Sequence, residues 1–354
     1  MASAEFQLVV DACRWSFTDG AADAMDVHVE GIDWPLLLKL TRRHRVQALV
    51  WHCLSAQQVP VPAATATALA GDSTGIAAAN LRATGESARL RELFAVADLP
   101  LLFVKGLPLA GLAYPHPFLK MGWDIDLLVA PESIAEAASI LRGAGYRQLV
   151  PGEKRDAAAW HRRRKESAWR HPEGFTVDLH SRLADHPRLI PGIDVWSPAQ
   201  QVEVAPGVTL PTLQLDELFA YLCVHGAVAA WFRLKWLADL AALLHHSSPA
   251  EVERLYRRSQ ELGAGRAPAQ ALLLAGRLFG TAVAAELRDE LERDSANRLL
   301  ERLALAQLAG RSSIEEPTER PFGTVTMHFG QLLLLPGWRF ALSDLRRQFR
   351  DLVR

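Results

Sequence analysis

The chain is poor in cysteine: its 354 residues include only three, Cys13, Cys53 and Cys223, and these lie far apart. An odd number of distant cysteines provides neither a disulfide framework nor a paired-cysteine zinc site, and it is typical of a reducing compartment. Long apolar runs are also absent, because the most apolar late stretch holds four consecutive leucines, whereas a membrane-spanning helix needs about 20 apolar residues. The N-terminal segment does not resemble a signal peptide. We therefore expect no membrane span and a cytoplasmic location.

Neither sign of charge is in excess. Lysine and arginine number 39 against 40 aspartates and glutamates, so the formal net charge is -1. A dedicated DNA-binding protein usually carries a net positive charge that attracts the polyanion, and this chain has none. Any contact with a polyanion must therefore come from a local group of basic residues. Hydrophobic residues make up 49% and charged residues 22% of the chain, which is typical of folded globular proteins. The length is about right for two domains.

The spacing of apolar residues changes twice along the chain. It is helical in the first hundred residues, mixed in the middle, and helical again after a Pro/Gly-rich connection around Pro206, Gly207 and Pro211. The sequence therefore predicts an α+β fold: a small mixed β-sheet core at residues 99–205, flanked by an N-terminal helical region at 1–98 and a C-terminal helical domain at 206–354. Within the core the patterns predict strands at 101–104, 124–129, 146–150 and 175–180, helices at 107–113 and 131–142, and a basic helix or hairpin at 156–165.

Three aspartates stand where the core pattern predicts strands. Asp124 and Asp126 are two residues apart and would project to the same face of one strand, and Asp178 lies on another strand. Hard divalent cations such as Mg²⁺ are held by a few carboxylates together with substrate phosphates and waters. The alternative without a functional role is a turn that enters a strand, where an aspartate caps the backbone or faces solvent. Because aspartate is rare in strands, we favour a metal site.

Several short motifs occur in a fixed order around these aspartates. They are Phe103-Val104-Lys105-Gly106, Ala113-Tyr114-Pro115, Asp124-Ile125-Asp126-Leu127-Leu128-Val129, Val177-Asp178-Leu179-His180, His225-Gly226-Ala227 and Arg233-Leu234-Lys235-Trp236-Leu237-Ala238-Asp239. In this order they resemble the uncharacterised nucleotidyltransferase family of bacteria, over roughly residues 90 to 245. The resemblance implies that the small sheet is a nucleotidyltransferase core.

The wider superfamily implies which positions bind substrate and metal. There, a Gly-Ser turn opening a helix binds the triphosphate, and three carboxylates bind the metal ions. The matching positions here are Lys105 and Gly106 for the nucleotide, and Asp124, Asp126 and Asp178 for Mg²⁺ or Mn²⁺ and for catalysis. The serine is missing, because Leu107 follows Gly106. Lys105 or Lys120 would supply a cation for the phosphates, although Lys120 is equally well interpreted as an ordinary solvated lysine.

The implied reaction moves a nucleoside monophosphate from a nucleoside triphosphate, such as ATP, to a hydroxyl or phosphate acceptor and releases pyrophosphate. Asp124 and Asp126 would bind both metal ions, and Asp178 would share one and help to activate the acceptor. Similar proteins are found near lasso-peptide biosynthesis genes, so a modified peptide is one candidate acceptor, beside a small antibiotic-like molecule or a tRNA end. Two alternatives remain: a toxin/antitoxin-type enzyme acting on RNA or protein, and a non-catalytic nucleotide- or peptide-binding protein.

Other polar residues are weaker candidates. His180 shares a strand face with Asp178 and would orient an aspartate, contact the nucleotide or act as a base, while His225 and Lys235 are possible substrate contacts. The basic run at 161–165, followed by Arg170 and His171, would clamp phosphates or form a solvated face, and we favour the solvated face. The segment at 338–354 is predicted to be an amphipathic helix that covers the core, or otherwise touches a partner or an anionic surface.

Overall fold

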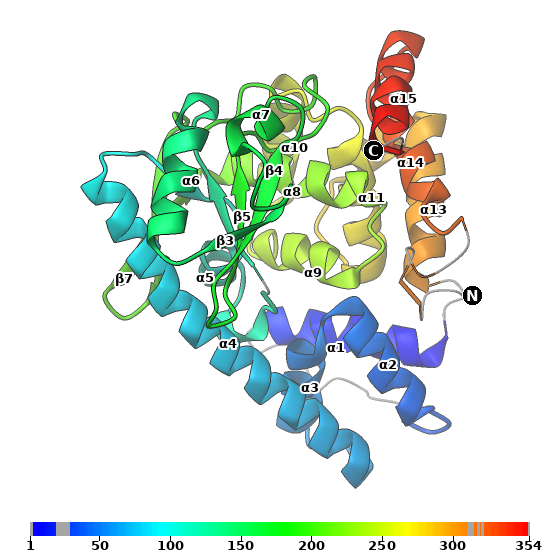
Figure 1. Cartoon of the computed structure of the whole chain (residues 1–354). Helices are drawn as coiled ribbons and strands as arrows, with labels where there is room; N and C mark the ends of the chain where they lie inside the picture. Colours follow the sequence, from blue (N-terminus) through cyan, green and yellow to red (C-terminus); the bar gives the residue numbers. More distant parts are fainter. Residues whose placement is uncertain are drawn as a thin grey trace. The chain divides into compact units, whose positions relative to one another are not determined.

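The computed structural model describes residues 3–18, 29–122, 124–309, 315–316, 319 and 322–352. The chain divides into two compact units, which we call the sheet unit, Gly75–Leu218, and the helical unit, Met1–Thr74 with Phe219–Arg354. The fold is α+β, as the sequence predicts, with a small mixed sheet and helices toward both ends of the chain (Figure 1). Among the described helices, none is both long and apolar enough to cross a membrane.

The sheet unit contains a five-stranded sheet in the order β1-β2-β5-β4-β3. Its strands are β1 (Leu102–Phe103), β2 (Ile125–Leu128), β3 (Arg147–Val150), β4 (Glu166–Arg170) and β5 (Thr176–His180). β2 and β5 run parallel and the other neighbours are antiparallel. In the parallel pair Asp126 stands opposite Asp178. Since side chains alternate between the two faces of a strand, this register puts both carboxylates on one face.

The other face of the sheet forms the core of the unit. Val177 and Leu179 of β5 alternate with the polar residues and pack with Leu127 of β2 against apolar side chains of the flanking helices. Those helices are the C-terminal part of α4 (Ala63–Val96), α5 (Leu107–Ala113), α6 (Ile134–Gly143) and α7 (Ala157–His161), with short 3-10 turns at Pro117–Leu119 and Pro131–Ser133. The predicted helix at 107–113 is confirmed, and the predicted strand at 175–180 begins one residue later.

Two parts of the sheet unit differ from the sequence prediction. The segment at 156–165 forms only the five-residue α7, and β4 follows it. The predicted Pro/Gly-rich connection is instead a hairpin of β6 (Ala199–Ala205) and β7 (Val208–Leu213), with Gly207 in its turn at φ 75°. The hairpin is tied to the larger sheet because the Thr212 hydroxyl donates a 2.6 Å hydrogen bond to the Phe103 carbonyl.

The described part of the helical unit consists of helices packed around a separate apolar interior. They are α1 (Ala4–Phe17), α2 (Trp34–His44), α3 (Gln47–Ala56), most of α8 (Leu215–Val228), α9 (Leu234–Leu243), α10 (Pro249–Glu261), α11 (Ala267–Phe279), α12 (Ala285–Arg293), α13 (Ser295–Ala309), α14 (Val325–Leu332) and α15 (Trp338–Leu352). The start of α4 also belongs to this unit. Local signals fix several helix ends; the Ser3 hydroxyl, for example, accepts a hydrogen bond from the Phe6 amide at the start of α1.

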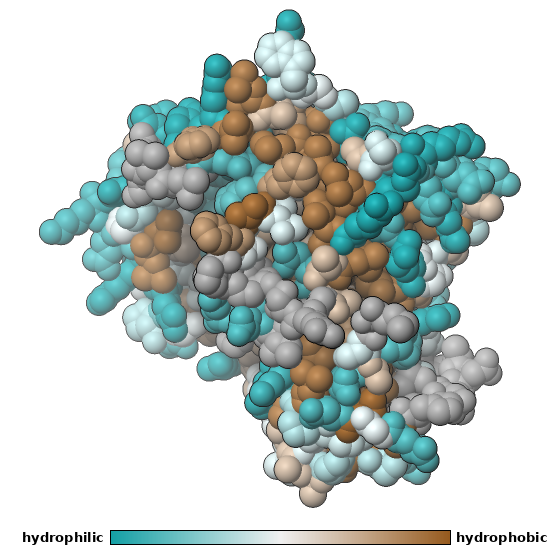
Figure 2. All heavy atoms as spheres, turned by 90° about the vertical axis from the view of Figure 1, so that its right-hand side faces the viewer, coloured by the Kyte–Doolittle hydropathy of each residue, from teal (hydrophilic) through white to brown (hydrophobic). Residues whose placement is uncertain are grey.

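The last helix, α15, has one buried face and one exposed face. Phe340 and Asp344 are 1% exposed, whereas Trp338 is 71% and Phe349 is 60% exposed. Figure 2 shows apolar surface in the upper part of the face that carries the C-terminal helices. The predicted helix is present, but its side chains Trp338, Leu342, Leu345 and Phe349 are exposed rather than packed on the core.

Candidate metal centre

Three carboxylates meet on the polar face of the sheet. One oxygen from each of Asp124, Asp126 and Asp178 lies within 4.8 Å of the others. Asp126 and Asp178 are brought together by the register of β2 and β5, and Asp124 stands just before β2, one residue outside the strand. The structure thus brings together the three aspartates that the sequence singled out.

Asp126 is the most buried member of the cluster. Its Oδ1 atom lies 2.9 Å from Lys105 Nζ and 3.1 Å from His180 Nε2. Burial by itself would raise the pKa of Asp126, but the charge of Lys105 and the hydrogen bond from His180 hold that pKa well below its usual range. Its Oδ2 atom is buried and has no hydrogen-bond partner among the described residues. Asp126 is therefore an ionised carboxylate with one oxygen that remains available to a ligand.

Asp178 has the opposite electrostatic environment. Burial, followed by the charges of Asp126, Asp124 and Glu166, raises the pKa of Asp178 to about 8. The cluster thus gathers more negative charge than the neighbouring cations neutralise. A hard divalent cation such as Mg²⁺ or Mn²⁺ needs carboxylate oxygens of this kind. The unpaired Oδ2 of Asp126 and the crowded carboxylates fit such an ion.

A fourth carboxylate lies beside the cluster, and the sequence analysis missed it. Glu166 begins β4 opposite His180, and its Oε2 atom lies 3.4 Å from His180 Nδ1. It also forms an ion pair with Lys165. Although burial opposes ionisation, the charges of Lys165 and His180 lower the pKa of Glu166 to about 2. His180 therefore stands between Glu166 and Asp126, which fixes its ring against the cluster.

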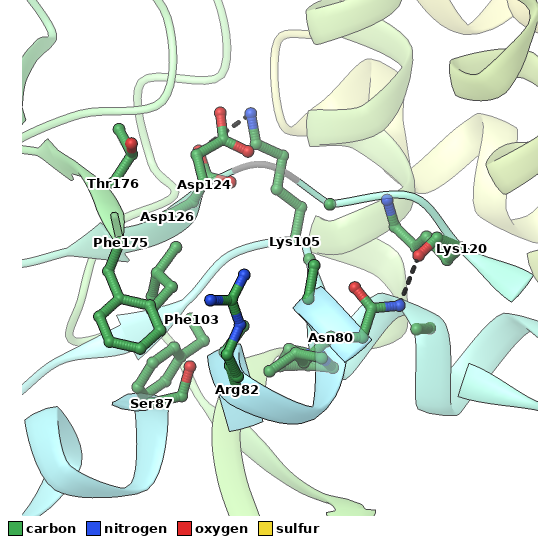
Figure 3. A pocket seen from close by; sticks show the side chains of 18 of the residues that line it. Asn80, Arg82, Ser87, Phe103, Lys105, Lys120, Asp124, Asp126, Phe175 and Thr176 are labelled. Carbon is green, nitrogen blue, oxygen red and sulfur yellow. Dashed lines mark hydrogen bonds and ion pairs between the residues drawn. The ribbon is translucent and has the colours of Figure 1, made fainter. Parts of the chain in front are cut away.

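A cavity of about 200 Å³ opens beside the carboxylates (Figure 3). Lys105, Gly106 and Lys120 line it, so the structure places all three nucleotide-binding candidates at one pocket. Lys120 is 7% exposed and is therefore not a solvated surface lysine. Asn80 of α4 supports this segment by donating a 2.8 Å hydrogen bond to the Lys120 carbonyl. Gly106 has φ 66°, a conformation that other residues rarely adopt, and it forms the tight turn into α5.

A comparison with known proteins identifies the family of the chain. A family model described as an uncharacterised nucleotidyltransferase matches residues 30–280, which include all three aspartates and the whole pocket lining. The chain belongs to this nucleotidyltransferase family. A search of curated proteins found no match. The family match is wider than the motif region around residues 90 to 245 and extends into both units.

Two residues that the sequence analysis gave as possible substrate contacts of this nucleotidyltransferase lie outside the sheet unit. His225 is on α8 and Lys235 is on α9, and both belong to the helical unit. The His225 ring packs edge-on against Trp236, with ring centroids 5.3 Å apart. The sheet unit alone therefore does not bring these two residues to the carboxylates, and their role as substrate contacts stays a prediction.

The basic run of the nucleotidyltransferase is not one continuous charged surface. His161 is 4% exposed, and its two ring nitrogens lie 2.8 Å and 2.9 Å from the hydroxyls of Ser181 and Ser167. Arg164 stacks on Trp160, with its guanidinium carbon 5.6 Å from the ring centroid. Arg162 and Arg163 are exposed. The run is thus partly a solvated face and partly a support for β4 and β5.

The burial of His161 predicts a pH-dependent stability. Burial, with help from the charges of His180 and Arg182, lowers the pKa of His161 to about 4. The unfolded chain, with a histidine pKa near 6.5, takes up a proton first, so stability present above pH 6.5 is lost as the pH falls toward 4. When the pH falls from 7 to 5, the unfolding free energy of both proteins should decrease. We expect the decrease to be about 2 kcal/mol larger in the wild type than in His161→Gln. Urea unfolding at both pH values measures this; equal losses would contradict it.

Proposed function

We propose that this protein transfers a nucleoside monophosphate from a nucleoside triphosphate to a hydroxyl or phosphate acceptor and releases pyrophosphate, with Mg²⁺ or Mn²⁺ as cofactor. The observation that carries the proposal is the meeting of Asp124, Asp126 and Asp178 beside a pocket, in a chain of a nucleotidyltransferase family. The unpaired Oδ2 of Asp126 supports a cation at this place.

Each carboxylate has a separate role in this proposal. Asp124 and Asp126 would hold both cations, and Asp178 would share one of them. When bound, the cations neutralise charge on the triphosphate and make the acceptor oxygen a better nucleophile. As a ligand of one cation, Asp178 would also help to activate the acceptor oxygen. Lys105, Gly106 and Lys120 would contact the phosphates of the donor, with Lys105 also keeping Asp126 ionised.

The acceptor and the cellular place are further parts of the proposal. A modified peptide of natural-product biosynthesis and a small antibiotic-like molecule are the favoured acceptors, and ATP is the first donor to test. The toxin/antitoxin alternative would need the basic run at 161–165 as a contact for its RNA or protein acceptor. The burial of His161 and the Lys165–Glu166 ion pair weaken it. A cytoplasmic location suits a nucleotide donor, and all three cysteines are buried thiols that form no disulfide.

The deciding experiment follows label from each α-³²P-labelled nucleoside triphosphate with Mg²⁺ or Mn²⁺. Candidate acceptors are a small-molecule extract, precursor peptides and tRNA, and the control is the double variant Asp124→Ala/Asp126→Ala. We expect label transfer and pyrophosphate release that disappear in the double variant. Label entering RNA would favour the toxin-type alternative. If no triphosphate binds the wild type with either metal, the enzyme proposal is wrong.

A further inference from the structure

We propose that the end of the pocket formed by Ser87, Phe103 and Phe175 binds the base of the donor nucleotide. The Phe175 ring would stack on the face of the base, and the Ser87 hydroxyl would hydrogen-bond to its polar edge. This inference rests on the proposed function and deepens it, because it assigns the residues that distinguish a nucleotide from a bare polyphosphate.

Ser87 provides the first line of support. Its side chain is 1% exposed and lines the pocket, and its hydroxyl has no hydrogen-bond partner in the described part of the chain. A buried hydroxyl on a helix normally bonds to the carbonyl four residues earlier. Thr84, one turn before it on α4, does so, because its hydroxyl donates a 2.9 Å hydrogen bond to the Asn80 carbonyl. The Ser87 hydroxyl is thus left for a group that enters the pocket.

Aromatic rings provide the second line of support. Phe103 and Phe175 line the same pocket, and Figure 3 shows their rings grouped near Ser87, apart from the carboxylates. Phe103 is buried in the core, whereas Phe175 is partly exposed and packs against the core from the side. A flat aromatic ligand can lie against such a wall. An aliphatic ligand would leave the Ser87 hydroxyl unpaired.

The distribution of charge orients the ligand. The carboxylate cluster with Lys105 stands at one end of the pocket, and in Figure 3 the Arg82 guanidinium lies between that end and the rings. Cations suit phosphate oxygens, while an aromatic wall suits the face of a base. A donor nucleotide placed with its phosphates toward the aspartates therefore directs its base toward Ser87 and Phe175.

The test compares two ligands that share the phosphates but differ in the base. Binding of an α,β-methylene nucleoside triphosphate, whose bridging carbon prevents transfer, and of inorganic tripolyphosphate is measured by calorimetry with Mn²⁺. We expect Phe175→Leu, which keeps an apolar side chain, to weaken nucleotide binding about tenfold and Ser87→Ala to weaken it about fivefold. Tripolyphosphate binding should not change in either variant.

A matched control separates binding from folding. Thr84→Val removes a hydroxyl that is already bonded within the helix, so it should lower the melting temperature without changing nucleotide affinity. Ser87→Ala should leave the melting temperature unchanged or raised. If the nucleotide binds Ser87→Ala and Phe175→Leu as tightly as wild type, the base site is wrong and the proposed function stands. An equal loss for tripolyphosphate would also overturn the base site. If neither ligand binds the wild type, both proposals fail.

Discussion

Replacing Asp126 with asparagine is expected to lower nucleotidyl transfer by about a thousandfold or more and to abolish tight Mn²⁺ binding. The substitution keeps the size of the side chain but removes its charge and replaces one of its two oxygens by an amide nitrogen. Metal ions contribute several kcal/mol to the stabilisation of the transition state in such reactions, and each 1.36 kcal/mol is a factor of ten in rate. The fraction of free Mn²⁺, followed by electron paramagnetic resonance, measures the binding without knowledge of the acceptor.

The same substitution at a second aspartate controls for the loss of one charge. Asp98 is exposed in the sheet unit and has φ 52°, a conformation that asparagine tolerates well. Asp98→Asn should therefore bind Mn²⁺ like the wild type. Because Asp126 is paired with Lys105 and His180, its variant also risks lower stability, so Asp124→Asn is tested beside it. Unchanged Mn²⁺ binding in folded Asp126→Asn and Asp124→Asn proteins would refute the metal centre.

The sequence predicted the parts of this site that depend on local pattern. The alternation of Val177 and Leu179 with Asp178 and His180 predicts both a strand and the face that it buries. The proximity of Asp126 to Asp178 does not follow from local pattern, because it depends on the register of β2 against β5. A slip of one residue would turn one of these carboxylates into the core. The family resemblance implied that these carboxylates bind metal together, whereas the register itself was not predicted and periodicity alone does not specify it.

The features that the sequence analysis missed are set by tertiary contacts. β4 is short and mixed in composition, and Glu166 directly follows the basic run at 161–165, so no local pattern marks it as the start of a strand. In the β6–β7 hairpin, Pro211 and Gly207 resembled a loop, yet Pro211 pairs with Gln201 in a two-stranded sheet that has no central strand to interrupt. Ser87 stands within a helix and has no local signal at all. The role that we propose for Ser87 rests on Phe103 and Phe175, which line the same pocket.

The glycine of the His225-Gly226-Ala227 motif has a packing role that predicts a large loss of stability. A Cβ atom at Gly226 would lie 2.4 Å from two ring atoms of Trp231, which is fully buried. The Trp231 amide also donates a 2.8 Å hydrogen bond to the Gly226 carbonyl, so backbone and ring are held together. Because neither can move away cheaply, Gly226→Ala should lower the unfolding free energy by about 3 kcal/mol. Urea unfolding followed by circular dichroism measures this.

The contrast with an open helical glycine makes the packing argument specific. Gly85 lies within α4, and a Cβ atom there would meet nothing within 4 Å. Gly85→Ala should therefore raise stability by about 0.5 to 1 kcal/mol, because alanine loses less backbone entropy than glycine when a helix forms. If crowding against the indole causes the loss, Trp231→Leu should cost less stability in the Gly226→Ala background than in the wild type, since the smaller side chain leaves room for the methyl group. Equal costs would show that Gly226 is needed for its backbone rather than for the space that it leaves to Trp231.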